Sequence, residues 1–157
     1  MSMIAEEKDY SSLVMRRRNL PHWEMAGATY FVTFELNEGE LSGEEIVFVK
    51  EHVKRGDPDF YRLLAMTVMP DHAHVLLQPN GGISLPRIMK GIKGASARSI
   101  NERRGRRGVL WRDESYDHII RNDAELEKTL EYILNNAPKR GLCEDGWEYP
   151  GFYLRGV

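Results

Sequence analysis

His72 and His74 lie two residues apart in a short segment that continues into an apolar run. Side chains two residues apart on a β-strand point to the same face of the sheet. Both imidazoles could therefore reach one divalent metal ion. Ala73, Val75 and Leu77 would face the other way and pack against helices. Two surface histidines at the start of a strand would give the same pattern, so the metal prediction depends on a third ligand.

Tyr132 and Asn136 are four residues apart in a segment near the C-terminus with helical spacing of apolar residues. Residues at this spacing lie on one face of a helix. The asparagine can supply a neutral oxygen ligand to a metal, and the tyrosine could attack a metal-bound phosphate. A phenol is mostly protonated at neutral pH, but a metal that polarises the phosphate suits it to phosphoryl transfer through a covalent ester. The other interpretation of Tyr132 is an aromatic side chain that packs on the sheet.

The charge of the chain is unevenly distributed. Its 157 residues include 22 basic and 24 acidic ones, and this net charge of −2 would by itself disfavour a nucleic-acid partner. One segment nevertheless holds nine basic residues and a single acid, Glu102; the basic residues are Arg87, Lys90, Lys93, Arg98, Arg103, Arg104, Arg106, Arg107 and Arg112. Such a concentration is typical of binding to a phosphate backbone. A solvated helix face followed by a flexible arginine-rich turn is the alternative.

The hydrophobic patterns predict alternating strands and helices. β-Branched and aromatic runs indicate strands, whereas apolar residues three and four apart indicate helices. We expect strands over 28–36, 60–69, 72–78 and 116–121, and helices over 43–55, 84–103 and 122–137, the last ending before Pro138. This order predicts an α+β protein with a ferredoxin-like βαββαβ antiparallel sheet, helices on one face, and an added C-terminal helix that carries the tyrosine.

The length suits a single domain over residues 1–157, with residues 1–15 expected to be flexible and residues 140–157 expected to form a C-terminal tail. No apolar run approaches the roughly 20 residues of a membrane-spanning helix. The acidic, polar start argues against a secretory signal, and the single cysteine, Cys143, indicates a reducing compartment. We therefore predict a cytoplasmic protein, monomeric or homodimeric, with no membrane partner.

Several short motifs occur in a characteristic order between Arg16 and Tyr153. They are LPHW at 20–23, YFVTF at 30–34, MPDHAH at 69–74, IKG at 92–94, Trp111 with ESYD at 114–117, and Tyr132-Ile-x-x-Asn136. In these motifs the chain resembles the REP-associated tyrosine transposases, which belong to the single-tyrosine HUH transposases and nucleases. It departs from the family in the small Ala73 between the histidines and in a proline at position 138, one place later than usual.

The resemblance implies a role for each matching residue. His72, His74 and Asn136 would hold a divalent metal, Mg²⁺ or Mn²⁺, although imidazole ligands by themselves also suit Zn²⁺ and Ni²⁺. Tyr132 would attack a phosphate of single-stranded DNA and form a 5′-phosphotyrosine intermediate. The nine basic residues would follow the DNA backbone, and the substrates would fold into small hairpins. The implied activity is that of a metal-dependent endonuclease and strand transferase, a transposase.

Three alternatives remain open from the sequence. The chain could be a non-catalytic or host-domesticated protein of the same fold that binds single-stranded nucleic acid. It could be a metal-dependent nucleotide hydrolase of the histidine-triad type, although that chemistry needs a third histidine where this chain has Leu76. Tyr116, next to Asp117, is a rival nucleophile, but its place in a predicted strand favours a structural role.

Overall fold

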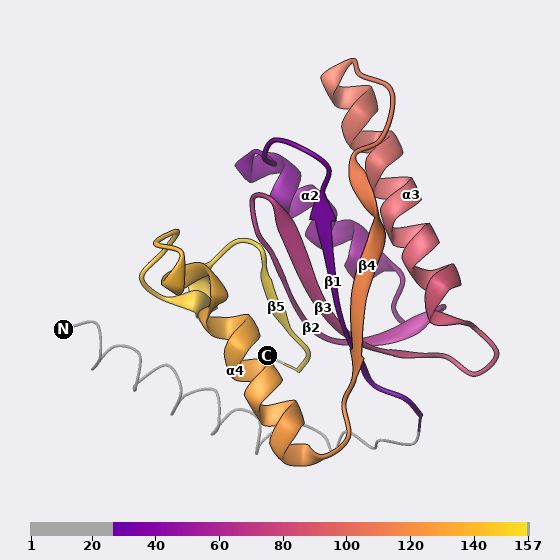
Figure 1. Cartoon of the computed structure of the whole chain (residues 1–157). Helices are drawn as coiled ribbons and strands as arrows, with labels where there is room; N and C mark the ends of the chain where they lie inside the picture. Colours follow the sequence, from indigo (N-terminus) through magenta and orange to yellow (C-terminus); the bar gives the residue numbers. More distant parts are fainter. Residues whose placement is uncertain (1–26, 157) are drawn as a thin grey trace.

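The structure, a computed structural model, describes residues 27–156, so the flexible segment predicted for residues 1–15 lies outside the described residues. Strands and helices follow one another in the predicted order (Figure 1). They are β1 (Tyr30–Leu36), α2 (Gly43–Arg55), β2 (Tyr61–Val68), β3 (His72–Pro79), α3 (Leu85–Arg104), β4 (Trp111–Ile119), α4 (Asp123–Lys139), the 3₁₀ turn η1 (Gly146–Glu148) and β5 (Phe152–Leu154).

The strands form one antiparallel sheet in the order β4-β1-β3-β2-β5. The first four strands and the two helices between them make the predicted ferredoxin-like βαββαβ unit, and this prediction is confirmed. β3 is the central strand, so its side chains are covered from both faces and by neighbours on both edges. Residues 73–77 of β3 are buried, so neighbours on every side fix their positions.

Helices cover the two faces of the sheet unequally. Ala73, Val75 and Leu77 of β3 share one buried cluster with α2 and α3, as their spacing predicts. Leu76 belongs to a second cluster, with the apolar stripe of α4. Figure 1 shows α2 and α3 on one side of the sheet and α4 on the other. His72 and His74 have the same parity as Leu76 and therefore lie on the face that α4 covers.

α2 begins at a capping box that also ties it to α3. The Ser42 hydroxyl accepts from the Glu45 backbone N–H, and the Glu45 carboxylate accepts from the Ser42 backbone N–H at 2.8 Å. The same carboxylate accepts two hydrogen bonds from the guanidinium of Arg104, at 2.7 and 2.8 Å. One acidic side chain thus closes the start of α2 and holds the end of α3 beside it.

α4 continues through Pro138 to Lys139, so the prediction that it ends before this proline was wrong. A proline in the last turn removes a single backbone hydrogen bond, the one to the carbonyl of Leu134. Gly146 packs directly on that carbonyl, because a Cβ on this glycine would lie 2.1 Å from the Leu134 oxygen. The chain after the helix covers the carbonyl that the proline leaves without its helical partner.

Two further elements differ from the sequence-based expectation. β4 begins at Trp111 rather than Tyr116, because Trp111 is buried and pairs with Leu36 at the end of β1. Residues 140–156, expected to be a tail, carry η1 and β5, and β5 adds to the sheet beside β2. The buried Tyr149 fastens this segment by donating a hydrogen bond to the carbonyl oxygen of Val68 at 2.7 Å. None of the helices in the described part of the chain is long and apolar enough to cross a membrane.

We expect Glu45→Gln to lower the free energy of unfolding by about 2 kcal/mol at pH 7, because it removes a charge-assisted pair that is mostly shielded from water. The hydrogen bonds from Arg104 lower the pKa of Glu45 from 4.5 to about 2. The stabilisation is therefore complete above pH 4.5 and is lost as the pH falls through about 2. Urea unfolding of both proteins at pH 7 and at lower pH measures this difference.

Glu44→Gln is the matched control for this prediction. Glu44 is exposed and contacts Arg103 at 3.4 Å, so its loss should change the free energy of unfolding by less than about 0.5 kcal/mol. Equal effects of the two substitutions would contradict the role assigned to Glu45.

Candidate metal and nucleophile site

The start of β3 holds the two histidines side by side. The ring centroids of His72 and His74 are 4.7 Å apart, and the ring planes are inclined by 76°. His74 is 5% exposed, and the aromatic ring of Phe31 on β1 stacks on it at 5.3 Å. The pair predicted from its spacing is therefore a close pair of rings on the α4 face of the sheet.

α4 brings Tyr132 and Asn136 to the same place. The helix buries its apolar stripe on the sheet, and Tyr132 lies at the edge of that stripe, 47% exposed. The ring of Tyr132 lies 5.2 Å from the ring of His74 and 6.0 Å from that of Phe31. Asn136, one helical turn further on, is 8% exposed. The ring of Tyr132 is thus in contact with that of His74 while the tyrosine remains accessible from solvent.

Each histidine is held through its Nδ1 atom. Nδ1 of His72 is 2.7 Å from Oδ1 of Asp71, and Nδ1 of His74 is 2.7 Å from the hydroxyl oxygen of Thr33 on β1. Such contacts leave Nε2 of each ring as the atom that can ligate a metal. Both residues lie within the sequence motifs, Asp71 next to His72 in MPDHAH and Thr33 in YFVTF, but the position of Thr33 opposite His74 depends on the pairing of β1 with β3.

Two buried polar atoms at this site have no hydrogen-bond partner: Nε2 of His74 and the side-chain oxygen of Asn136. A buried polar atom without a partner is costly and uncommon in proteins. An imidazole nitrogen and an amide oxygen can both ligate a divalent cation. In the described part of the chain no group of three His, Cys, Asp or Glu residues could hold a metal, so a third ligand at this site would have to be of another type. The donors present fit a divalent metal.

The protonation states at the site also suit a metal. Burial, assisted by the charge of His72, lowers the pKa of His74 from 6.5 to about 3. His74 is therefore neutral at physiological pH, which is the form that ligates metals. Burial tends to raise the pKa of Asp71, but hydrogen bonds and charge from His72 and Arg140 outweigh it and lower that pKa. Asp71 is consequently a carboxylate that can accept the Nδ1 proton of His72.

The basic segment lies on the opposite face of the sheet, because α3 packs against the face away from α4. Several of its cations are paired with acids from elsewhere in the chain. These pairs are Arg103 with Glu44, Arg104 with Glu45, Arg106 with Glu38 and Arg112 with Glu35. Among the described residues, Arg87, Lys90, Arg98 and Arg107 have no acidic partner. The sequence could not show this division, since the acids lie 59 or more positions away.

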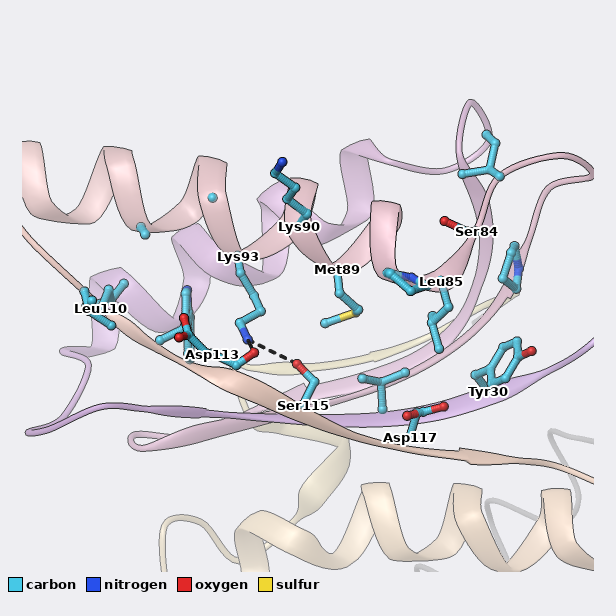
Figure 2. Close-up of a pocket in the computed structure, with 18 of the residues that line it drawn as sticks. Tyr30, Ser84, Leu85, Met89, Lys90, Lys93, Leu110, Asp113, Ser115 and Asp117 are labelled. Carbon is cyan, nitrogen blue, oxygen red and sulfur yellow. Dashed lines mark hydrogen bonds between the residues drawn. The ribbon is translucent and has the colours of Figure 1, made fainter.

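Lys93 joins α3 to β4. Its ammonium donates hydrogen bonds to the backbone oxygens of Arg112 and Asp113, at 2.5 and 2.9 Å, and to the hydroxyl of Ser115 at 3.2 Å. Figure 2 shows Lys93 reaching toward Ser115 across the groove between the helix and the strand. Lys93 therefore has a structural role, whatever it contributes to binding.

Two cavities adjoin α3. The larger, of about 1000 Å³, lies between α3 and strands β1 and β4, and both basic and acidic side chains line it, including Lys90, Asp113 and Asp117 (Figure 2). The smaller, of about 540 Å³, lies beside the end of α2. Its described lining includes Arg55, Arg87 and Lys90 but no acidic residue. The unpaired cations at the start of α3 thus surround a concave, positively charged surface.

Tyr116, the rival nucleophile, is 57% exposed on β4. Thr33 of β1 pairs with Tyr116 on one side and with His74 on the other. Tyr116 and His74 are therefore separated by two strand spacings, roughly 10 Å between Cα atoms. The ring of Tyr132 contacts that of His74, so Tyr132 is better placed than Tyr116 to act next to the histidines.

Comparison with known proteins identifies the family. The family described as "Transposase IS200 like" matches residues 48–136, more than half of the chain and a segment that includes both histidines, Tyr132 and Asn136. The chain belongs to this family. The resemblance inferred from the sequence motifs is thereby confirmed.

Individual relatives agree with this assignment. A Haemophilus influenzae protein named as a REP-associated tyrosine transposase is 27% identical over 105 residues, which cover 59% of this chain and 60% of that protein. The chain thus spans about three fifths of this relative's length. A solved REP-associated tyrosine transposase bound to a REP hairpin superposes with a TM-score of 0.65 at 22% identity, covering 85% of this chain and 80% of that one. The solved structure of a Deinococcus radiodurans protein named as a transposase superposes with a TM-score of 0.53 at 21% identity. The match covers 74% of this chain and 96% of that one.

We expect the purified IS200-like protein to bind one Mn²⁺ ion per chain at this site, and Asn136→Ala to weaken that binding about tenfold or more, because it removes the oxygen expected to ligate the ion. Replacing both His72 and His74 by alanine should abolish the binding. Titration of Mn²⁺, followed by electron paramagnetic resonance, measures the affinities.

Asn135→Ala is the matched control, because Asn135 is also buried on α4 but donates its side-chain N–H to the backbone oxygen of Glu131 at 2.9 Å. We expect it to bind Mn²⁺ as the unchanged protein does. Full Mn²⁺ affinity in the double histidine variant would show that the metal binds elsewhere.

Proposed function

We propose that this IS200-like transposase is a metal-dependent single-stranded DNA endonuclease and strand transferase that acts through a phosphotyrosine intermediate. One observation carries the proposal. The ring of Tyr132 lies 5.2 Å from that of His74, and the Nε2 atom of this histidine and the side-chain oxygen of Asn136 are buried without partners. These features support a site in which Tyr132 is the nucleophile and His72, His74 and Asn136 supply two nitrogen ligands and one oxygen ligand.

In this proposal His72, His74 and Asn136 would hold Mg²⁺ or Mn²⁺, and a metal bound there would supply charge that polarises the scissile phosphate. The hydroxyl oxygen of Tyr132 forms a bond to phosphorus, and the bond between phosphorus and the 3′ oxygen breaks. The phenolic proton is lost and the departing 3′ oxygen takes up a proton, so the products are a 5′-phosphotyrosine ester and a free 3′-hydroxyl. Attack by a second 3′-hydroxyl on this ester would complete strand transfer.

The proposed substrate is DNA that folds into a hairpin. The solved structural relative is bound to a REP hairpin, and this supports a substrate of the same class. The unpaired cations Arg87 and Lys90 and the acid-free cavity beside them provide a surface that attracts a phosphate backbone. This surface and the Tyr132 site lie on opposite faces of the sheet, so one DNA molecule that contacts both must pass around the edge of the sheet.

Tyr132→Phe should abolish covalent attachment of DNA, because the substitution removes only the oxygen that forms the ester. Incubation with single-stranded hairpin oligonucleotides and Mn²⁺, followed by denaturing electrophoresis, detects the adduct. The affinity for uncleaved DNA should change less than about twofold, since the ring remains in place. Tyr116→Phe is the control and should form the adduct normally. An adduct that persists in Tyr132→Phe and disappears in Tyr116→Phe would reassign the nucleophile.

Removing the unpaired cations should weaken DNA binding without affecting the chemical site. The double variant Arg87→Gln/Lys90→Gln is expected to bind a hairpin oligonucleotide about tenfold more weakly and to reduce the salt dependence of binding by about two counterions. Fluorescence anisotropy in EDTA, at several salt concentrations, measures both quantities.

The control variant Arg103→Gln/Arg106→Gln also removes two cations, but each of these already contacts a glutamate, at 3.4 and 3.2 Å. It should therefore bind more tightly than Arg87→Gln/Lys90→Gln. An equal loss of DNA affinity in the two variants would show that binding depends on the overall positive charge of the basic segment and not on Arg87 and Lys90 in particular.

A further inference from the structure

Two threonines flank His74 in the sheet. Thr33 of β1 and Thr67 of β2 are its direct partners in the antiparallel pairing on either side. All three side chains point to the α4 face, because directly paired residues share a face. The hydroxyls nevertheless do different things. Thr33 lies 2.7 Å from Nδ1 of His74, whereas Thr67, fully buried, donates toward the sulfur of Met69 at 3.8 Å.

The contact with Thr33 affects which nitrogen of His74 carries the proton. A neutral imidazole carries one proton, on either Nδ1 or Nε2, and the nitrogen without it is the one that can ligate a metal. The stacked ring of Phe31 at 5.3 Å and the edge of Tyr132 at 5.2 Å restrict rotation of the ring. With the ring held in this way, the partner of Nδ1 decides which nitrogen remains free.

We propose that Thr33 is a positioning residue that accepts the Nδ1 proton of His74 and thereby keeps the lone pair of Nε2 free for the metal. This inference rests on the proposed function, because it deepens the role of the same site. The bond also explains how the buried Nε2 atom can be without a hydrogen-bond partner: it is left as an acceptor, and a cation is the partner it requires. For His72 the partner of Nδ1 is the carboxylate of Asp71 instead of a hydroxyl.

The experiment compares Thr33→Val with Thr33→Ser in the full chain. Valine has nearly the shape of threonine and suits a strand, so the fold should be retained while the hydrogen bond is lost. We expect Thr33→Val to bind Mn²⁺ tenfold or more weakly, in the range found when a second partner of a ligating histidine is removed. Thr33→Ser keeps the hydroxyl and should bind within about threefold of the unchanged protein. Mn²⁺ titration by electron paramagnetic resonance gives these affinities.

A second measurement reports on the mechanism directly. Long-range ¹H–¹⁵N spectra of the metal-free protein should show the His74 proton on Nδ1 in the unchanged protein and in Thr33→Ser, and on Nε2 in Thr33→Val. Thr67→Val is the matched control: it removes a hydroxyl from the other neighbour of His74 and should change neither the protonated nitrogen nor the Mn²⁺ affinity.

The outcomes separate this inference from the proposed function. Unchanged affinity and an unchanged protonated nitrogen in Thr33→Val would overturn the role of Thr33 and leave the proposed function intact. Equal losses in Thr33→Val and Thr67→Val would also overturn it, because they would indicate a general packing effect. If the unchanged protein binds no Mn²⁺, the metal-dependent function fails, and the nitrogen that carries the proton still decides whether Thr33 positions His74.

Discussion

The rest of the structure depends on the central strand β3, which is buried on both faces. Its side chains alternate between two environments, so Ala73, Val75 and Leu77 enter the core beneath α2 and α3. His72, His74 and Leu76 face α4 instead. A shift of one residue in the register of β3 would place imidazoles in an apolar core and bring apolar side chains to the site. The cost of burying polar groups therefore fixes which face of the sheet carries the two histidines.

The site combines buried polar atoms without hydrogen-bond partners and neighbouring polar groups that are hydrogen-bonded. The buried His74 nitrogen and Asn136 oxygen lack hydrogen-bond partners, and each such atom works against folding. Around them the structure is well satisfied: Thr33 and Asp71 contact the two Nδ1 atoms, and aromatic rings enclose His74. Two unsatisfied buried atoms close to an accessible tyrosine are typical of a site that binds a ligand, because packing elsewhere in the domain supplies the stability that these atoms cost.

The net charge of −2 takes on a different meaning in the structure. The basic segment looked like a continuous stripe for phosphates, but four of its arginines lie beside glutamates of β1, α2 and the loop between them. The pairs of Arg103 and Arg104 hold the end of α3 beside α2, and all four pairs lower the positive potential of the segment. Of the four cations of this segment that have no acidic partner among the described residues, Arg87 and Lys90 lie at the start of α3, Arg98 lies in its second half and Arg107 follows it.

The sequence by itself predicted the four strands and two helices of the βαββαβ unit, the helix α4 and the chemical types at the site, but not the start of β4 or the strand β5. The alternation of polar and apolar residues on β3, the helical spacing of apolar residues on α4, and the helix caps Ser42 and Ser84 are local patterns. Each involves residues only a few positions apart, so the sequence alone displays it. Only the tertiary structure decided that Thr33 lies beside His74, that β5 joins the sheet, and that α3 faces away from Tyr132. These features follow from strand register and from contacts between residues far apart in the chain. The free energy of folding in such contacts depends on burial and not on local conformational preference.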